Sequence, residues 1–186
     1  MLDRGCATLN VVISNTVRER LVADSYTSVG LLQQLAGELL WEASVRRRGF
    51  QRRIVDDASY GKARAKVVNS ISARFNPFVD NFAKTESGEF DALIRNVLWV
   101  VTARLDDSTL LAGVGVQMLC DEMTIVDATV TPEVTVAGLE RLEAAHRALD
   151  IQPAVLAYDP ARRLLILADR RFLLYRRLVG RKWPWD

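Results

Sequence analysis

The segment from Asn96 to Leu149 limits the fold of this chain most, because its periodicity changes once along its length. Three apolar runs rich in β-branched and aromatic residues come first, separated by short acidic sequences that are typical of turns. They are residues 97–105, 109–119 and 123–130. Pro132 interrupts this pattern, since proline has no N–H group to donate to a strand. Beyond Glu133 the apolar residues recur about every 3.6 positions, so we expect an antiparallel β-meander followed by a helix.

The predicted strands are therefore followed by the sequence Val130-Thr-Pro-Glu133 and then by a glycine-containing loop that opens a helix. This order, over about residues 96–180, resembles the core of the GCN5-related N-acetyltransferases. In that family the loop binds the pyrophosphate of acetyl-CoA with its backbone N–H groups and the positive end of the helix. The resemblance implies an acetyl-CoA site at Thr135, Val136, Ala137 and Gly138. Gly138 stands at the family's first glycine, whereas Thr135 replaces an arginine or glutamine and Glu140 replaces the second glycine.

The same resemblance implies which residues would transfer an acyl group from CoA to an amine. In such enzymes a tyrosine on the last helix protonates the departing thiolate, and Tyr175 lies one residue from the matching position. Glu133 is the first candidate for the general base that deprotonates the amine, and Asp127 is the second. The alternative is structural: an ordinary meander packed on an amphipathic helix, with Tyr175 in the core and both carboxylates in turns.

The net charge of +2 conceals three blocks of alternating sign. Residues 1–85 hold 13 Lys and Arg against 8 Asp and Glu, residues 86–158 hold 4 against 12, and residues 159–186 hold 8 against 3. This separation either steers a charged partner toward the protein or reflects pairing between the blocks in the folded chain.

Arginines gather at the end of a helix that we expect to begin at Thr27 or Ser28. They are Arg46, Arg47, Arg48, Arg52 and Arg53. The first three have a structural explanation, because cations suit the last turn of a helix that ends near Arg48. Phe50 and Tyr60 lie among the cations, and aromatic rings interleaved with cations favour single-stranded RNA or DNA. The alternative is a solvated basic surface.

The last basic block follows a short predicted strand at residues 153–158. Asp159 and Pro160 are typical of a helix start, and an apolar stripe beyond them predicts a basic helix that ends at Gly180. Arg163, Arg170 and Arg177 recur every seven residues on this helix, as a ridge for phosphates or for an acidic protein partner. The alternative is a hairpin across Asp159–Arg162, which would give a winged-helix-like ending.

Composition sets the remaining limits. With 186 residues, 49% of them hydrophobic and 26% charged, the chain is expected to form one α+β domain over residues 1–186. We expect a helical N-terminal half, with a strand at residues 7–13 and a second helix at residues 63–75 that stops before Pro77. The mostly antiparallel meander, the central helix, a short strand and the basic C-terminal helix follow it. The chain has no secretory signal and no apolar run long enough for a bilayer, so we expect a cytoplasmic protein with no membrane partner. With two cysteines and one histidine, we expect no metal site.

Two functions are compatible with these patterns. The resemblance predicts a CoA-dependent N-acyltransferase-like protein with acetyl-CoA as its cofactor. The arginines predict a non-catalytic module that binds nucleic acid, or an acidic protein within a larger complex. Fold analogy alone does not decide between them, and the sequence has neither a Walker phosphate loop nor a dinucleotide fingerprint.

Overall fold

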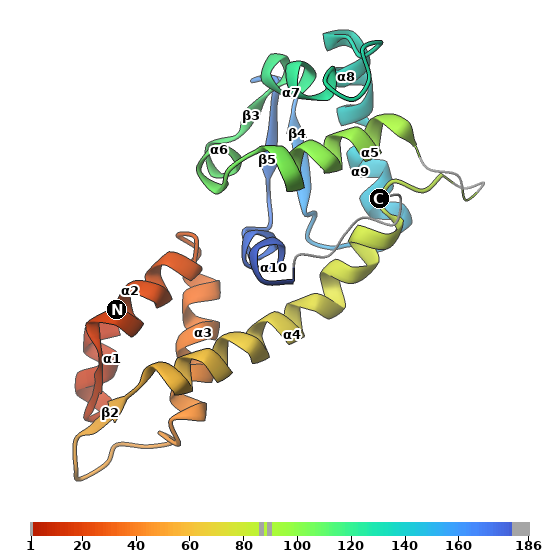
Figure 1. Cartoon of the computed structure of the whole chain (residues 1–186). Helices are drawn as coiled ribbons and strands as arrows, with labels where there is room; N and C mark the ends of the chain where they lie inside the picture. Colours follow the sequence, from red (N-terminus) through yellow and green to blue (C-terminus); the bar gives the residue numbers. More distant parts are fainter. Residues whose placement is uncertain (1, 86–87, 89–90, 180–186) are drawn as a thin grey trace. The chain divides into compact units, whose positions relative to one another are not determined.

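A computed structural model describes residues 2–85, 88 and 91–179. Helices and two small sheets make the protein α+β, and its N-terminal half is helical, as the sequence predicts (Figure 1). Within the described residues the chain divides into two compact units. Unit 1 comprises residues 2–73 with 177–179, and unit 2 comprises residues 74–176. The prediction of one domain over residues 1–186 stays a prediction.

Unit 1 combines helices with a short parallel strand pair (Figure 1). Its elements are α1 (Leu2–Leu9), β1 (Val11–Ile13), α2 (Asn15–Asp24), α3 (Val29–Glu42), β2 (Arg53–Val55) and the first part of α4 (Asp57–Asn81). β1 and β2 pair from Val11 opposite Arg53 to Ile13 opposite Val55. The strand expected at residues 7–13 is therefore correct only from Val11 onward, because the preceding residues belong to α1.

The predicted helix start at Ser28 is confirmed, since its hydroxyl accepts the Leu31 N–H at 3.3 Å. The expected end near Arg48 is wrong, because α3 ends at Glu42 and Ser44 adopts a left-handed conformation at φ 57°. The second expected helix, residues 63–75, is part of a longer helix, α4. It continues through Pro77, which the sequence reading took as its stop.

The core of unit 1 contains one buried carboxylate among its leucines. The Tyr60 hydroxyl donates to Asp24 Oδ2 at 2.7 Å, and Arg64 and Arg177 pair with the same carboxylate. Burial, and then the hydrogen bond to Asp24, raise the pKa of the Tyr60 hydroxyl. Asp24 is thus partnered on both oxygens, as a buried charge requires.

Unit 2 is built from short helices and a three-stranded antiparallel sheet in the order β3-β5-β4 (Figure 1). After the end of α4 its elements are α5 (Ala92–Trp99), the π-helical turn η1 (Val100–Arg104), α6 (Asp107–Ala112), β3 (Val114–Gly115), α7 (Val116–Met123), α8 (Pro132–Glu140), α9 (Leu142–Ala148), β4 (Leu156–Asp159), β5 (Leu164–Leu167) and α10 (Arg171–Val179). The last three residues of α10 group with unit 1.

The β-meander expected between residues 97 and 130 is wrong, because these residues are mostly helical. Side-chain caps fix the helix starts: Asp91 accepts the N–H groups of Leu93 and Ile94, and Asp106 accepts that of Thr109. The β-branched residues of these helices belong to the hydrophobic core of unit 2, and Val97, Val100 and Val101 are fully buried. Packing has overridden the preference of such residues for strands.

The hairpin weighed as an alternative for the C-terminal block is present, and the helix favoured from Asp159 onward is wrong in its first half. β4 and β5 pair from Leu156 opposite Leu167 to Asp159 opposite Leu164. Asp159 Oδ1 accepts the N–H groups of Ala161 and Arg162, which closes the turn instead of starting a helix. The strand expected at residues 153–158 is confirmed in its second half.

The core of unit 2 contains an aromatic cluster around the only histidine. Its rings belong to Phe75, Phe78, Phe82, Phe172 and Tyr175. His146 Nδ1 lies 2.7 Å from the Leu142 carbonyl, and Nε2 accepts the Val155 N–H at 2.9 Å. His146 therefore joins α9 to the start of the hairpin, and its burial lowers the pKa of its imidazole.

A helix, a strand, two helices and a hairpin occur in this order in unit 2, as α5, β3, α7, α8 and β4–β5. η1 and α6 lie between α5 and β3, and α9 lies between α8 and the hairpin. The first of these strands pairs with the second strand of the hairpin. Apart from the inserted α6 and α9 this connectivity is winged-helix-like, with α7 and α8 as a helix pair joined by residues 124–131 and residues 160–163 as the wing turn.

Candidate nucleic-acid interface

The connection between α3 and β2 is the most basic part of the described chain, and we call residues 44–53 the arginine loop. It contains five arginines and no acidic residue. Because α3 ends before Ala43, these arginines do not serve as the last turn of a helix, as the structural explanation from sequence assumed. Four of them lie in the loop itself, and Arg53 begins β2.

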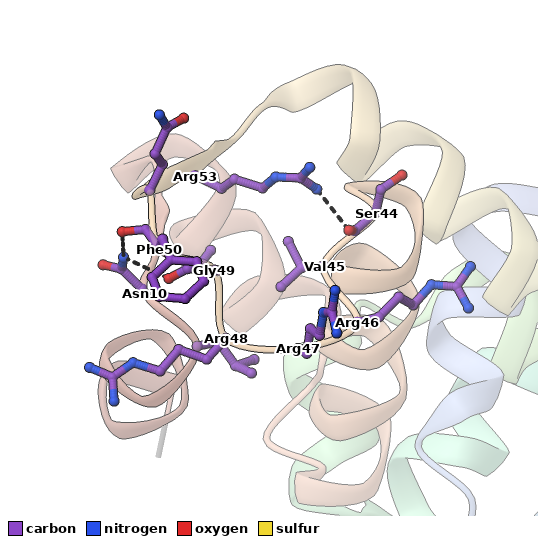
Figure 2. A pocket seen from close by; sticks show the side chains of 12 residues that line it. Asn10, Ser44, Val45, Arg46, Arg47, Arg48, Gly49, Phe50 and Arg53 are labelled. Atoms are coloured by element: carbon purple, nitrogen blue, oxygen red, sulfur yellow. Dashed lines mark hydrogen bonds between the residues drawn. The ribbon is translucent and has the colours of Figure 1, made fainter.

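Two polar side chains hold the arginine loop in place (Figure 2). Asn10, in a left-handed conformation between α1 and β1, donates from Nδ2 to the carbonyls of Gly49 and Phe50 at 3.1 and 3.2 Å. Arg53 donates to the carbonyls of Ala43 and Ser44 at 3.1 and 2.7 Å, and so caps the end of α3. Arg53 therefore has a structural role, because it joins the two ends of the loop, and Asn10 holds the loop between those ends.

The other four arginines are exposed. The guanidinium of Arg46 lies over the ring of Trp41, which is itself half exposed. Within the part of the chain that the structure describes, Arg46, Arg47, Arg48 and Arg52 form no ion pair. Their charges are thus available to a ligand.

The arginine loop borders a hollow of about 500 Å³ (Figure 2). Arg46, Arg47, Arg48 and Phe50 line it together with Asn10 and the buried Val45. The ring of Phe50 is fully exposed to solvent. A hollow with several guanidinium groups and one exposed ring offers charge to phosphates and a flat face to a base.

Tyr60, the second aromatic residue that the sequence placed among the cations, is buried on α4 and bonded to Asp24, so it is not part of this surface. Sequence reasoning missed Asn10 and Trp41, which support the loop. Asn10 had one signal: asparagine adopts left-handed backbone conformations more readily than most residues.

The arginine ridge expected on the C-terminal helix is absent, because its members lie on different elements. Arg163 is exposed in the wing turn at φ 53°, and Arg170 precedes α10. Arg177 lies on α10 and pairs with Asp24 at 3.3 Å. The spacing of seven residues had meaning only for a continuous helix.

The residues expected to bind acetyl-CoA lie inside α8 and do not form a loop. The Thr135 N–H donates to the Thr131 carbonyl at 2.8 Å, and Val136, Ala137 and Gly138 continue the helix, so their N–H groups donate to carbonyls one turn back. Thr135 and Gly138 are buried, and a Cβ on Gly138 would collide with the side chain of Leu93.

The two residues expected to catalyse acyl transfer lie on separate helices. Glu133 is exposed in the first turn of α8, where hydrogen bonds from its own backbone N–H and from Thr131 lower the pKa of its carboxyl group. Tyr175 is buried on α10, and its hydroxyl donates to Asn76 Oδ1 at 2.9 Å. Asp127, the second candidate base, accepts hydrogen bonds from Thr129 that lower its pKa.

The sequence matches no protein-family model, no curated protein and no solved structure. Across the described residues no three His, Cys, Asp or Glu side chains gather in a way that would hold a metal ion. No helix in the same part of the chain is both long and apolar enough to span a membrane.

Proposed function

We propose that this protein binds single-stranded nucleic acid through the arginine loop. One observation carries the proposal: four exposed arginines without a carboxylate partner lie in the same loop as a fully exposed phenylalanine, and three of them line a hollow together with it. Phosphates attract such guanidinium groups irrespective of sequence, through charge and paired hydrogen bonds.

Phe50 favours a single strand over a duplex. A base that stacks on an aromatic side chain gains about 1–3 kcal/mol, but bases in a duplex already stack on one another. Exposed phenylalanine is unfavourable in water, so a partner that covers the ring also removes apolar surface from solvent. The order of affinity that we expect is therefore single strand above duplex of the same length.

An acidic protein segment is the competing ligand for the same arginines. It would satisfy the guanidinium groups, but a carboxylate side chain offers no flat face for Phe50. Nucleic acid uses both features of the loop, and the proposal rests on that difference.

The prediction of CoA-dependent acyl transfer stays a prediction. It has less support than nucleic-acid binding, because the backbone N–H groups that it assigns to pyrophosphate belong to the interior of α8. A calorimetric titration with acetyl-CoA tests it directly, and saturable binding would return it to first place.

The test of the proposed function uses a fluorescein-labelled 12-nucleotide single strand and the same sequence as a duplex, with fluorescence anisotropy as the readout. Arg47→Ala/Arg48→Ala/Arg52→Ala is the test variant. Arg4→Ala/Arg147→Ala/Arg162→Ala removes three exposed arginines from other places and is the matched control. We expect the test variant to reduce the slope of log affinity against log salt by about 2, at roughly 0.7 per phosphate contact, and the control to leave it unchanged. Equal slopes in both variants would refute the interface.

A further inference from the structure

The helix–turn–helix face of unit 2 consists of the exposed residues of α7, of the connecting residues 124–131 and of α8. α7 and α8 pack against each other (Figure 1). In proteins that read DNA with a helix–turn–helix, the second helix enters the major groove and its first residues contact the bases. The charge of this face decides whether it is suited to that role.

Residues 116–140 contain five carboxylates and no lysine or arginine. The carboxylates are Asp121, Glu122, Asp127, Glu133 and Glu140. Only Glu122 forms an ion pair with a described residue, Arg104. On α8, the helix that would enter a groove, Glu133 and Glu140 are both exposed. These carboxylates would repel phosphates. The charge of the face therefore opposes nucleic-acid binding, although the connectivity is winged-helix-like.

The same face exposes large apolar side chains. They are Met118 on α7, Ile125 and Val126 in the connection, and Val134 in the first turn of α8. Single exposed apolar residues are ordinary on a protein surface, but four of them within residues 118–134 offer apolar area that a partner could cover. Methionine adapts its shape to different partners, and Met118 is well placed to do so.

We propose that the helix–turn–helix face binds a polypeptide segment whose apolar residues are flanked by lysines or arginines. The apolar side chains supply the buried area, and the four carboxylates that form no ion pair with a described residue select a basic partner and repel an acidic one. This inference does not depend on the proposed function, because it concerns other residues, in unit 2.

A second copy of this chain is the competing occupant. Its arginine loop and the exposed Ile54 next to it are basic and apolar, as the proposed partner must be. Self-association is therefore an outcome that the test must separate from binding of another protein.

The experiment selects binders without assuming their sequence. A display library of random 16-residue peptides is panned against the full-length protein, and enriched peptides are synthesised and titrated by anisotropy. The test variant is Ile125→Ser/Val126→Ser. Val22→Ser/Val29→Ser on unit 1 is the matched control, because these valines are exposed to a similar extent, 55% and 58% against 60% and 55%. Circular dichroism establishes that both variants are folded.

We expect enriched peptides that alternate apolar residues with lysine or arginine. Their dissociation constants should rise about tenfold in the test variant and stay unchanged in the control. Asp121→Asn/Glu140→Gln should weaken the same peptides about threefold and flatten their salt dependence. Both results together support the proposal.

Three results would overturn it. One is a selection that enriches no peptide, or only peptides that bind the test variant equally well. Another is concentration-dependent dimerisation in sedimentation that Ile125→Ser/Val126→Ser abolishes, which would assign the face to a second copy. The last is a loss of nucleic-acid affinity in that variant, which would assign the face to nucleic acid.

Discussion

The arginine loop and residues 116–140 each contain five charged side chains of one sign, but they are built for different partners. In the loop, cations and an exposed aromatic ring line the same hollow. The face combines carboxylates with a methionine and a valine on helices and with an isoleucine and a valine in the connection between them. Charge sets the sign of the partner in both regions, whereas the apolar groups between the charges set its chemical class.

The two regions also differ in how their geometry is maintained. The loop depends on two side chains, Asn10 and Arg53, that bond to its backbone. The face depends on helix hydrogen bonds and on side-chain caps such as Thr131, which accepts the Val134 N–H. A single substitution is therefore expected to disturb the loop more readily than the face.

The largest effect is expected from reversing charge in the loop. Arg47→Glu/Arg48→Glu should reduce affinity for the single strand more than about 100-fold at low salt, because attraction to phosphate becomes repulsion. The peptides selected on the helix–turn–helix face should bind this variant unchanged. Anisotropy with both probes measures the two affinities, and a parallel loss of both would show that the regions are not separate sites.

Removing the exposed ring should have the next largest effect. Phe50→Ala is expected to weaken the single strand about tenfold, since stacking is worth about 1–3 kcal/mol, and to leave duplex affinity unchanged. Phe50→Trp should restore binding. Thermal unfolding should not change, because the ring is fully exposed. Equal losses for strand and duplex would mean that Phe50 stacks on no base.

Loosening the loop should have a smaller effect than removing its ligand-binding groups. Asn10→Ala deletes two hydrogen bonds to the loop carbonyls and should cost about 1–2 kcal/mol of stability. Single-strand affinity should fall about threefold, as a more mobile loop loses more entropy on binding. The control is Asn69→Ala, an exposed asparagine on α4. If Asn10→Ala left hydrogen exchange at residues 44–53 unchanged, Asn10 would not hold the loop.

The smallest effect is a pH dependence that should distinguish the units. His146 is buried with a lowered pKa, so the unfolded chain binds a proton more readily than the folded one. The contribution of the neutral His146 imidazole to the free energy of unfolding is therefore fully present above the ordinary histidine pKa of about 6.5. It is lost as the pH falls below that value. As the pH falls, protection factors, which are corrected for the slower intrinsic exchange at low pH, should drop in residues 142–167 before they drop in residues 15–39. His146→Gln should remove the difference if it is due to this imidazole.

Side-chain caps and turn residues were the dependable signals in the sequence. Ser28 begins α3 as expected, and the arginine cluster is exposed as the nucleic-acid hypothesis required. Asp159 was recognised as a residue that bonds nearby N–H groups, but such a carboxylate closes a turn as well as it starts a helix. The pairing of β4 with β5, from Leu156 opposite Leu167 to Asp159 opposite Leu164, decides the matter, and the residues next to Asp159 do not reveal it.

The main error came from reading β-branched residues as strands. Val97, Val100 and Val101 would suit a buried strand, but they are equally suited to a buried helix when Asp91 caps it. The sequence predicts that these arginines form a candidate site, but it does not predict the role of each arginine. Which arginine binds a ligand and which one holds the loop follows from the carbonyls that Arg53 reaches, and no local pattern encodes that contact.

The arginines of the loop also make cleavage by trypsin a measure of whether a ligand covers the loop. Trypsin cleaves after arginine, and five of its sites are concentrated here within ten residues of exposed chain. A ligand that covers the loop should shield these peptide bonds, whereas one that binds elsewhere should leave them open to the protease. The pattern of fragments would then report, without any label on protein or ligand, which surface has been engaged.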